Sequence, residues 1–366
     1  MPARYTGSKR RRYEMALDAL LSFGVTVRDA VCKMFVKAER LNGLAKENPD
    51  PRAIQFRAAK YCVALASYLR PIEHQVYNLS CGSKGVPPTR NIAKGLNSVQ
   101  RADLLILKAS YFVSPVFISL DASRFDKHVS EELLKKEHKI YLACNPDPFF
   151  KLLLSWQIVN RCVSSIGIKY VAQGRRMSGD MNTASGNCLL MMMMLIGFSL
   201  TLMLHRWDCL DDGDDATLIV EAEDAQRVID ALPGAFRSYG MTLKVEPPQV
   251  SVYSVEFCQS HLIQFDIGRY KFVRDYKAVM SKALCGIRHW QNRTYRLRVL
   301  YATGMCELVL NLGVPVLQEF ALVLMRSGLE CDFDYAADGL KLRAKRDARA
   351  LGSFHVEPRQ ITDVAR

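Results

Sequence analysis

The alternation of apolar and polar positions predicts a strand-rich middle section of the chain. A β-branched and aromatic run at 116–120 is typical of a strand that ends at Asp121. Leu210 and the apolar run 216–220 stand on either side of a turn-prone Asp-Gly pair, which predicts a hairpin. Further predicted elements in this section are a helix over 224–239, a strand over 241–246 and a strand pair over 250–267.

The sections before and after the strands carry mostly helical patterns. They predict helices over 13–36 (two patches separated by Gly24), 58–69, 97–110, 127–141 and 149–163, and mostly helix from 275 onward. The second of these should stop before Arg70-Pro71, and the basic segment 37–57 reads as a loop. The predicted fold class is therefore α+β.

The most apolar segment of the chain is 188–204, which contains four consecutive Met residues. It has 17 residues, at the lower limit of about 17 for a membrane span. Polar residues 178–187 directly precede it, and Ser178-Gly179 is expected to open the helix. A buried core helix is the favoured interpretation, with a membrane span as the alternative.

Charge is spread unevenly along the 366 residues, whose formal net charge is +13. Residues 1–101 carry 18 basic and 7 acidic side chains, whereas 208–224 carry eight acidic side chains and no basic one. Two solvated faces would explain this. A sharper explanation is an anion-binding channel beside a carboxylate cluster that binds metal.

Cysteine spacing gives no sign of a zinc site or a disulfide framework. There are eleven cysteines, none within a Cys-x-x-Cys pair, and the two nearest in sequence are Cys144 and Cys162. A reducing compartment fits this usage best.

Two groups of carboxylates are candidates for metal-dependent chemistry. Asp121 ends a predicted strand and Asp126 follows five residues later, a spacing that a helix cap and a solvated residue would also explain. Four more carboxylates crowd the predicted turn 211–215, where like charges repel unless a cation offsets them. Two divalent cations held by Asp oxygens suit phosphoryl transfer. An acidic solvent loop is the alternative.

Two further segments carry polar side chains in suggestive patterns. Thr183 and Asn187 lie at i and i+4 on one face of the apolar helix, where Asn187 would be a poor core residue unless it faces a cleft. The basic segment 37–57 could bind a triphosphate through Lys and Arg donors. A solvated basic loop explains it about as well.

The order of these motifs resembles that of viral RNA-dependent RNA polymerases. A basic loop is followed by Asp-x4-Asp, then Ser-Gly-x3-Thr-x3-Asn, then Gly-Asp-Asp. The segments YTGSKRRRYEMAL, FVKAE, PRAIQFR, YLRPIEH, DASRFDKHVS, GMTLKVE and VEFCQS are similar to the polymerase core of tombusviruses and their relatives. This similarity extends from Tyr5 to about residue 285.

The resemblance implies a set of site residues. Asp121 and Asp214 would be the principal ligands of two Mg²⁺ (or Mn²⁺) ions, with Asp215 supporting them. Asp126 and Asn187, assisted by Thr183, would recognise the ribose 2′-hydroxyl. Lys244 would be the general acid toward pyrophosphate, although an exposed strand lysine is an equal alternative.

Other implied contacts involve phosphate and RNA. Ser178 and Gly179 match a loop that contacts the RNA backbone, and Phe257-Cys258-Gln259-Ser260 matches a hairpin that holds the end of the new strand. Triphosphate contacts would be, in order of preference, Lys37 and Arg52, then Lys46 and Arg57. The basic run 341–349 would contact product RNA or be an exposed basic helix.

The family fold is a right hand with an antiparallel palm sheet. The implied division is fingers 1–112, palm 113–138, fingers insertion 139–177, palm 178–274 and thumb 275–366. RNA template, nascent RNA and NTPs would be the partners. The chain would be a compact member of the group or the polymerase portion of a readthrough product. A viral membrane-anchoring protein would recruit it to membrane-associated replication complexes in the host cytoplasm, without a transmembrane segment of its own.

Three other functions remain open on the sequence. A reverse transcriptase would share the layout but carry a bulky aromatic residue near position 126. A non-catalytic RNA-binding protein would use the basic N-terminal section and leave the acidic turn unexplained. A membrane protein would be built around 188–204.

Overall fold

The computed structural model describes residues 2–5, 7–39, 50–286 and 289–360. Its longer helices are α1 (Gly7–Phe23), α2 (Ala59–Tyr77), α3 (Ser98–Ala109), α5 (Glu131–Cys144), α6 (Pro148–Ser155), α7 (Thr183–Thr201), α8 (Ala222–Ser238), α9 (Tyr276–Ala283), α10 (Arg293–Leu310), α11 (Leu317–Ser327) and α12 (Asp338–Leu351). Short helical turns are η1 (Pro2–Arg4), η2 (Val27–Ala30), α4 (Phe125–His128), η3 (Val252–Ser254) and η4 (Phe333–Tyr335).

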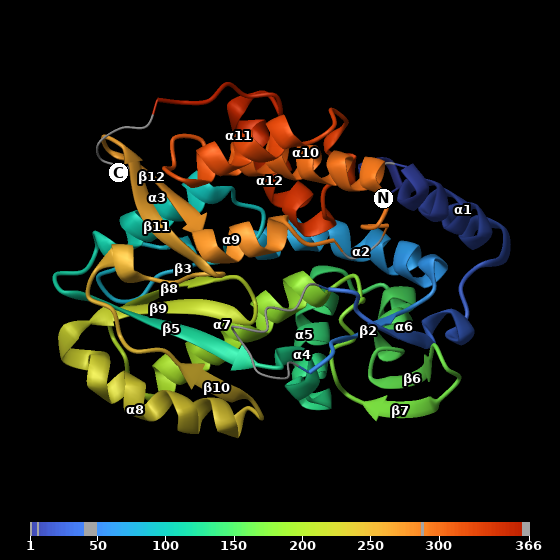
Figure 1. Ribbon diagram of the computed structural model, residues 1–366. Coiled ribbons are helices and arrows are strands. Elements are labelled where there is room, and N and C mark those ends of the chain that lie inside the picture. Colours follow the sequence, from blue (N-terminus) through green and yellow to red (C-terminus); the bar gives the residue numbers. More distant parts are fainter. Residues whose placement is uncertain (1, 6, 40–49, 287–288, 361–366) are drawn as a thin grey trace.

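Strands form two four-stranded sheets and two hairpins (Figure 1). The central sheet has the order β10 (Thr242–Val245), β5 (Pro115–Ser123), β9 (Asp215–Glu221), β8 (Trp207–Asp211), with every neighbouring pair antiparallel. The N-terminal sheet has the order β2 (Ala53–Phe56), β1 (Cys32–Val36), β6 (Val159–Ser164), β7 (Lys169–Gln173). The hairpins are β11 (Ser260–Asp266) with β12 (Arg269–Arg274), and β3 (Ser80–Cys81) with β4 (Thr89–Arg90).

The two faces of the central sheet pack against different partners. Successive side chains of a strand point to opposite faces. Ile118 and Leu218 therefore join the core formed with α7 and α8, whereas Phe117 and Ile219 join a second core beneath α3 and the β11–β12 hairpin. In Figure 1, α8 lies below this sheet and the hairpin lies above it. The second face carries Asp121 and Asp215, so both carboxylates face away from α7 and α8.

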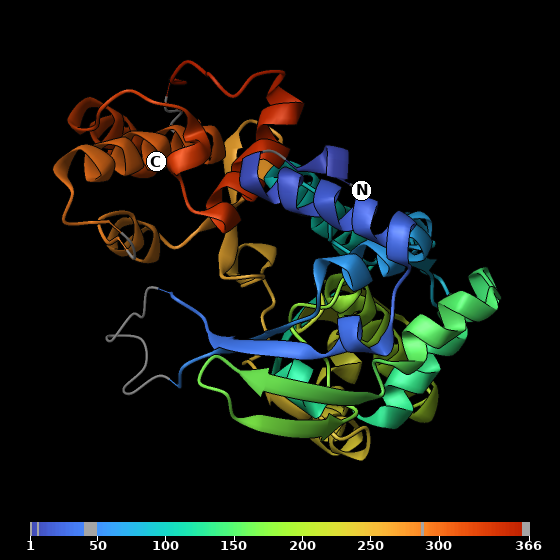
Figure 2. The same ribbon diagram turned by 90° about the vertical axis from the view of Figure 1, so that its right-hand side faces the viewer.

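The N-terminal sheet joins segments that are far apart in the sequence. β1 pairs antiparallel with β2 and parallel with β6, which starts more than 120 residues later. Figure 2 shows the blue strands of the first segment beside the green strands of the second. Residues 159–173 thus belong to the same sheet as β1 and β2, within residues 32–56.

Helix α7 is a buried core helix, as the apolar segment 188–204 predicts. Among the described residues, it is the one helix long and apolar enough to cross a membrane, and about two thirds of it is buried (67%). Met191, Met192 and Met194 all lie in the main core. Its apolar character is therefore used for packing behind the central sheet.

The C-terminal helices α10, α11 and α12 form a separate layer above the β11–β12 hairpin (Figure 1). Ala302, Cys306 and Ala344 lie at the contact between α10 and α12. Asp347 of α12 accepts a hydrogen bond from the backbone N–H of Ser98 (3.2 Å), which starts α3. This layer therefore closes over the second face of the central sheet.

The α+β class and the antiparallel hairpin 207–221 are confirmed. The predicted helices over 97–110 and 224–239 and the mostly helical C-terminal section are also observed. The predicted helix 127–141 is split into α4 and α5.

Several predicted boundaries are wrong, mostly where tertiary pairing decides. Residues 32–36 and 53–56 are strands rather than helix and loop, because each finds a partner strand. The predicted helix 149–163 ends at Ser155 and becomes β6 for the same reason. Helix α2 continues through Pro71, because Ile72 and Val76 beyond it are buried in the core.

Two further corrections concern the surroundings of the site. Helix α7 begins at Thr183 rather than at Ser178, and the residues before it form a turn in which the Gly179 N–H donates to the Gln55 carbonyl (2.7 Å). The predicted strand pair 250–267 is instead β11 and β12, and the residues before Ser260 form η3 and a turn.

Candidate active site

Three carboxylates gather at one end of the central sheet. Asp121 stands directly opposite Asp215 in the β5–β9 register, and directly opposite residues of an antiparallel pair share a face. Asp214 lies in the preceding turn, where its carbonyl accepts from the Ala122 N–H (3.2 Å). Lys244 is opposite Asp121 on the other side, so it belongs to the same row of side chains.

The turn before Asp214 depends on Gly213. Its φ is +101°, a conformation that side-chain-bearing residues rarely adopt. A Cβ there would also lie 3.3 Å from the Cβ of Asn187. Gly213 therefore gives the turn its shape and lets it lie against the start of α7.

The side chains of Asp121, Asp214 and Asp215 form no hydrogen bond or ion pair with the described part of the protein. Asp121 and Asp214 are exposed, and Asp215 is half-buried. Burial, followed by the negative charges of Asp214 and Asp121, raises the pKa of Asp215 to about 6. The site is thus a concentration of negative charge to which the described residues give no ion pair.

Two neighbouring aspartates of the same hairpin, Asp208 and Asp212, form ion pairs, whereas Asp211 forms none with the described residues and burial raises its pKa. Asp208 pairs with Lys108 (2.7 Å), and both side chains are fully buried. Asp212 contacts Lys94 (2.8 Å) and Arg101 (3.1 Å). Burial alone would raise the pKa of Asp212, but these two cations lower it.

The donor chemistry at the three uncompensated carboxylates fits hard divalent cations. Carboxylate oxygens are the ligands that Mg²⁺ prefers, and two carboxylates facing each other across a strand pair need positive charge nearby. The side chains of Asp121, Asp214 and Asp215 are neighbours, but they do not converge on one point. Within the described ranges, no group of three His, Cys, Asp or Glu side chains is close enough to hold an ion.

The predicted ribose-recognition pair is in contact. Asn187 Nδ2 donates to Asp126 Oδ1 (2.8 Å). Burial raises the pKa of Asp126, and this hydrogen bond opposes the rise. The Thr183 hydroxyl lies 3.0 Å from the carbonyl oxygens of Met177 and Asp180, so it holds the turn before α7. Ser178 and Gly179 lie beside β2, near Gln55.

Two of the predicted triphosphate contacts are exposed at the ends of β1 and β2. Lys37 and Arg52 share the carboxylate of Glu39, with Lys37 Nζ 3.7 Å and Arg52 Nε 2.7 Å from its oxygens. The Glu39 hydrogen bond raises the pKa of Arg52, and the charge of Asp214 adds to that rise, so the two groups interact electrostatically. Lys46 lies outside the described residues.

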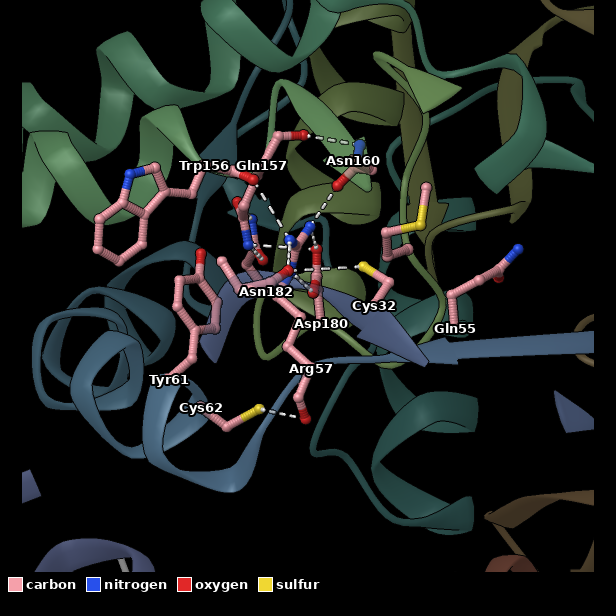
Figure 3. Close-up of polar contacts among 12 residues, drawn as sticks. Cys32, Gln55, Arg57, Tyr61, Cys62, Trp156, Gln157, Asn160, Asp180 and Asn182 are labelled. Atoms are coloured by element: carbon pink, nitrogen blue, oxygen red, sulfur yellow. Dashed lines mark hydrogen bonds and ion pairs between the residues drawn. The ribbon is translucent and has the colours of Figure 1, made fainter. Parts of the chain in front are cut away.

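Arg57 is a correction, because it cannot reach a nucleotide. Its side chain is buried and paired with Asp180, with 2.6 Å between Arg57 Nε and Asp180 Oδ1. It also donates to Asn160 and to the Ala30 carbonyl. Figure 3 shows this guanidinium surrounded by polar partners from several segments. Arg57 therefore holds the N-terminal sheet to the turn before α7.

The turn before β11, for which RNA contacts are predicted, has side chains in different surroundings. Cys258 and Gln259 both have positive φ, at 52° and 56°, and both line the cavity described below. Cys258 Sγ lies 3.0 Å from Asp212. The Phe257 ring, in contrast, is buried against Phe272, so it supports the turn from beneath and does not face RNA.

A cavity of about 300 Å³ lies between Asp214, Asp215 and the C-terminal helix α12. Its lining includes four arginines: Arg101, Arg274, Arg343 and Arg346. Partial desolvation, followed by the charge of Arg274, lowers the pKa of Arg343, although its side chain stays open to solvent. Neither Arg343 nor Arg346 has an ion pair within the described residues. The cavity therefore has positive charge free for an anion.

Sequence reasoning missed Lys94, Arg101, Glu137 and Arg176, which contact the candidate site residues or their partners. No local motif marks them, because their partners are distant in sequence. Glu137 and Arg176, for example, are 39 positions apart. The placement of Arg176 two residues before Ser178-Gly179 was the one available signal.

An uncompensated acidic centre beside an arginine-lined cavity is typical of proteins that act on phosphate esters. Comparison of sequences makes the class specific. A family model described as viral RNA dependent RNA polymerase matches residues 1–366. The chain therefore belongs to the viral RNA-dependent RNA polymerase family.

Known relatives agree with this family. The RNA-directed RNA polymerase of tobacco necrosis virus (strain A) is 38% identical over 86% of this chain and 44% of its own length. That of melon necrotic spot virus is 35% identical over 97% of this chain and 46% of its own length. That of groundnut rosette virus (strain MC1) is 36% identical over 88% of this chain and 38% of its own length. The chain thus spans less than half the length of these relatives.

Proposed function

We propose that this chain is the catalytic unit of an RNA-dependent RNA polymerase that copies the genome of a plus-strand RNA virus. It would join NTPs to the 3′-hydroxyl of RNA and release pyrophosphate. The observation that carries the proposal is the row of uncompensated carboxylates, Asp121, Asp214 and Asp215, in a chain of this family.

Asp121 and Asp214 would be the principal ligands of two Mg²⁺ ions, with Asp215 supporting them; Mn²⁺ would be a substitute. When bound, the ions would supply activation of the 3′-hydroxyl and neutralisation of the phosphate charge. The strand register makes Asp121 and Asp215 neighbours, so rotation of these two side chains would bring their carboxylates toward a shared ion.

The surrounding side chains would bind and orient the NTP. Lys37 and Arg52 are exposed and would exchange Glu39 for the triphosphate. Asp126 would accept from the ribose 2′-hydroxyl through the oxygen that Asn187 leaves unused. Lys244, next to Asp121, is exposed, and its hydrogen bond with Glu246 raises its pKa, so the side chain is protonated. As general acid it would give this proton to the departing pyrophosphate.

The right-hand description follows from the same placement. The central sheet (113–138 and 178–274) would be the palm, and the C-terminal section 275–366 the thumb. Segments 1–112 and 139–177 would form the fingers, which the pairing of β1 with β6 supports. Arg343 and Arg346 would then bind RNA phosphates from the thumb side of the cavity.

RNA template and nascent RNA would occupy the cavity and its surroundings. Because α7 is packed inside the protein, attachment to host membranes would use another part of the viral protein or a viral membrane-anchoring partner. The site of action would be a membrane-associated replication complex in the host cytoplasm.

The decisive experiment is an incorporation assay with the purified chain, a short RNA template, Mg²⁺ and NTPs. RNA synthesis that the Asp214→Ala variant lacks is the expected result. Synthesis by that variant at the wild-type rate would overturn the metal assignment. A preference for dNTPs would favour a reverse transcriptase, and RNA binding without any synthesis would favour a non-catalytic RNA-binding protein.

A further inference from the structure

A second buried arginine lies close to the ribose-recognition pair. Arg176, two residues before Ser178, forms an ion pair with Glu137 of α5, and both side chains are buried. Arg176 Nη1 donates to Glu137 Oε1 (3.2 Å), and Asn182 Nδ2 donates to the same oxygen (2.8 Å). A buried ion pair is a costly feature that seldom adds net stability, so its presence beside the site calls for a specific use.

Arg176 contacts both members of the pair. Its Nε donates to Asn187 Oδ1 (3.0 Å), and its backbone N–H donates to the Asp126 carbonyl (2.9 Å). A guanidinium has donors only, so the amide of Asn187 must turn its oxygen toward Arg176. Its Nδ2 is then left to face Asp126, as observed at 2.8 Å.

We propose that Arg176, held by Glu137, is a positioning residue that fixes the orientation of the Asn187 amide and thereby sets the preference for ribose over deoxyribose. The inference rests on the proposed polymerase function. With the amide fixed, Asp126 Oδ1 is engaged by Asn187 and Oδ2 has no donor from the described residues. That oxygen is available to a ribose 2′-hydroxyl.

Loss of Arg176 would release the amide. A rotation of 180° would point Asn187 Oδ1 at the Asp126 carboxylate, where two acceptors repel each other. Asp126 would then move or take another donor, and its contact with the sugar would weaken. An NTP would lose this contact, whereas a dNTP has no 2′-hydroxyl and would lose nothing.

Gly186 shows how tightly the ion pair is packed. A Cβ at this position, one residue before Asn187 in α7, would lie 2.5 Å from Arg176 Nη2 and would also collide with Glu137 Oε1. Glycine inside a helix is unfavourable by roughly 1 kcal/mol relative to alanine. Close approach of the Glu137–Arg176 pair is the physical reason for its use here.

The first test compares Arg176→Lys with the wild-type chain. Lysine keeps a cation for Glu137, but its compact ammonium cannot replace the planar fork that reaches both Glu137 and Asn187. We expect the ratio of kcat/KM for ATP to that for dATP to fall about tenfold, the effect of one charge-assisted hydrogen bond. The kcat/KM for dATP should stay close to the wild-type value.

Arg57→Lys is the matched control. Arg57 makes the other buried arginine–carboxylate pair of this region, with Asp180, and has no contact with Asn187. It should lose thermal stability at least as much as Arg176→Lys while keeping the ATP-to-dATP ratio. A purely structural role of Arg176 would make the two variants behave alike, with equal losses for both nucleotides.

Two further variants keep the test decisive if Arg176→Lys does not fold. Glu137→Gln weakens the hold on Arg176, and Gly186→Ala pushes the pair aside without touching Asn187; both should lower the ratio. In an Asn187→Ala background, Arg176→Lys should cause no further drop. An unchanged ratio in the folded variants overturns the inference and leaves the polymerase function standing. Absence of any NTP incorporation by the wild-type chain overturns the proposed function and the inference with it.

Discussion

Five aspartates of β5 and the β8–β9 hairpin fall into two groups with different surroundings. Asp208 and Asp212 receive cations from the protein, namely Lys108 for the first and Lys94 with Arg101 for the second. Asp121, Asp214 and Asp215 receive none from the described residues. The β8–β9 hairpin thus contains aspartates that stabilise the structure through ion pairs and aspartates that are available to bind a cation from solution.

The presence or absence of an ion pair distinguishes structural carboxylates from functional ones more clearly than their solvent exposure does. An ion pair that is complete within the protein fixes neighbouring elements, as Lys108 joins α3 to β8. A group of like charges without a counter-charge raises the energy of the folded protein, and after burial the charges of Asp214 and Asp121 contribute to the raised pKa of Asp215. Such a group is retained because it binds something, and the predictions below test this reasoning.

The largest effect is expected at Asp214. Asp214→Ala should reduce RNA synthesis by at least about 10³-fold, because a ligand that neutralises phosphate charge is lost. Its free energy of unfolding should stay within about 0.5 kcal/mol of the wild-type value or rise, because no partner is lost and a repulsion is removed. Incorporation assays and thermal unfolding measure the two quantities. A large loss of stability would place Asp214 in the structural group.

Breaking the buried Lys108–Asp208 ion pair should mainly reduce stability, in contrast to Asp214→Ala, which should mainly reduce activity. Lys108→Met leaves Asp208 buried without its cation and should lower the free energy of unfolding by about 3–5 kcal/mol. Denaturant unfolding measures this loss. The control is Arg10→Met, which breaks the exposed Arg10–Glu14 pair and should change stability by less than about 1 kcal/mol. Similar losses in both variants would contradict the role assigned to burial.

Lys271 tests a buried cation that forms no ion pair with the described residues, although the charge of Asp347 opposes the fall of its pKa. Burial, with Arg359 and Arg269 nearby, lowers its pKa to about 8. Below pH 8 the folded protein holds a buried charge at a cost, and between pH 8 and about 10.5 the unfolded state binds more protons, so this cost declines as pH rises. Lys271→Met should therefore be more stable than wild type by up to about 3 kcal/mol at pH 7.

The pH dependence of that difference is the sharper measurement. The advantage of Lys271→Met should shrink steadily above pH 8 and vanish above about pH 10.5. Lys84→Met, at an exposed position, should show no such trend. A gain in stability that is independent of pH would show that packing, rather than charge, explains the effect.

The smallest effect is expected at the arginines of the cavity. Arg343→Gln or Arg346→Gln should weaken RNA binding several-fold at low salt and reduce the slope of log affinity against log salt by about 1. Neither arginine has an ion pair to lose among the described residues, so stability should stay unchanged. Arg349→Gln, exposed on the same helix but outside the cavity lining, is the control. Equal slopes in all three variants would remove α12 from the RNA-binding surface.

Sequence reasoning was reliable where the pattern is local. Alternation predicted the strand that ends at Asp121 and the hairpin around Gly213, and both are observed. The resemblance to viral polymerases also implied that Asp126 and Asn187 form a pair, and the two side chains share a hydrogen bond. The short segments of the N-terminal sheet were missed, because a four- or five-residue strand is stabilised by a partner that can lie more than 100 residues away.

Arg52 and Arg57 show the limit most clearly. They lie five residues apart in one basic segment, and the sequence assigned both to a triphosphate. Arg52 is exposed beside Glu39, whereas Arg57 is buried against Asp180. Periodicity cannot distinguish them, since the side chain that meets Arg57 comes from a turn 123 positions further along.

The sequence by itself determined the class of the fold, the family and the identity of the acidic residues at the site. Each depends on local patterns or on motifs in a fixed order. Only the tertiary structure decided which charges are neutralised, which remain free and how Arg176 holds Asn187. The physical reason is that electrostatic interactions depend on distance and burial in the folded protein, and partners such as Glu137 and Arg176 become neighbours only when the chain folds.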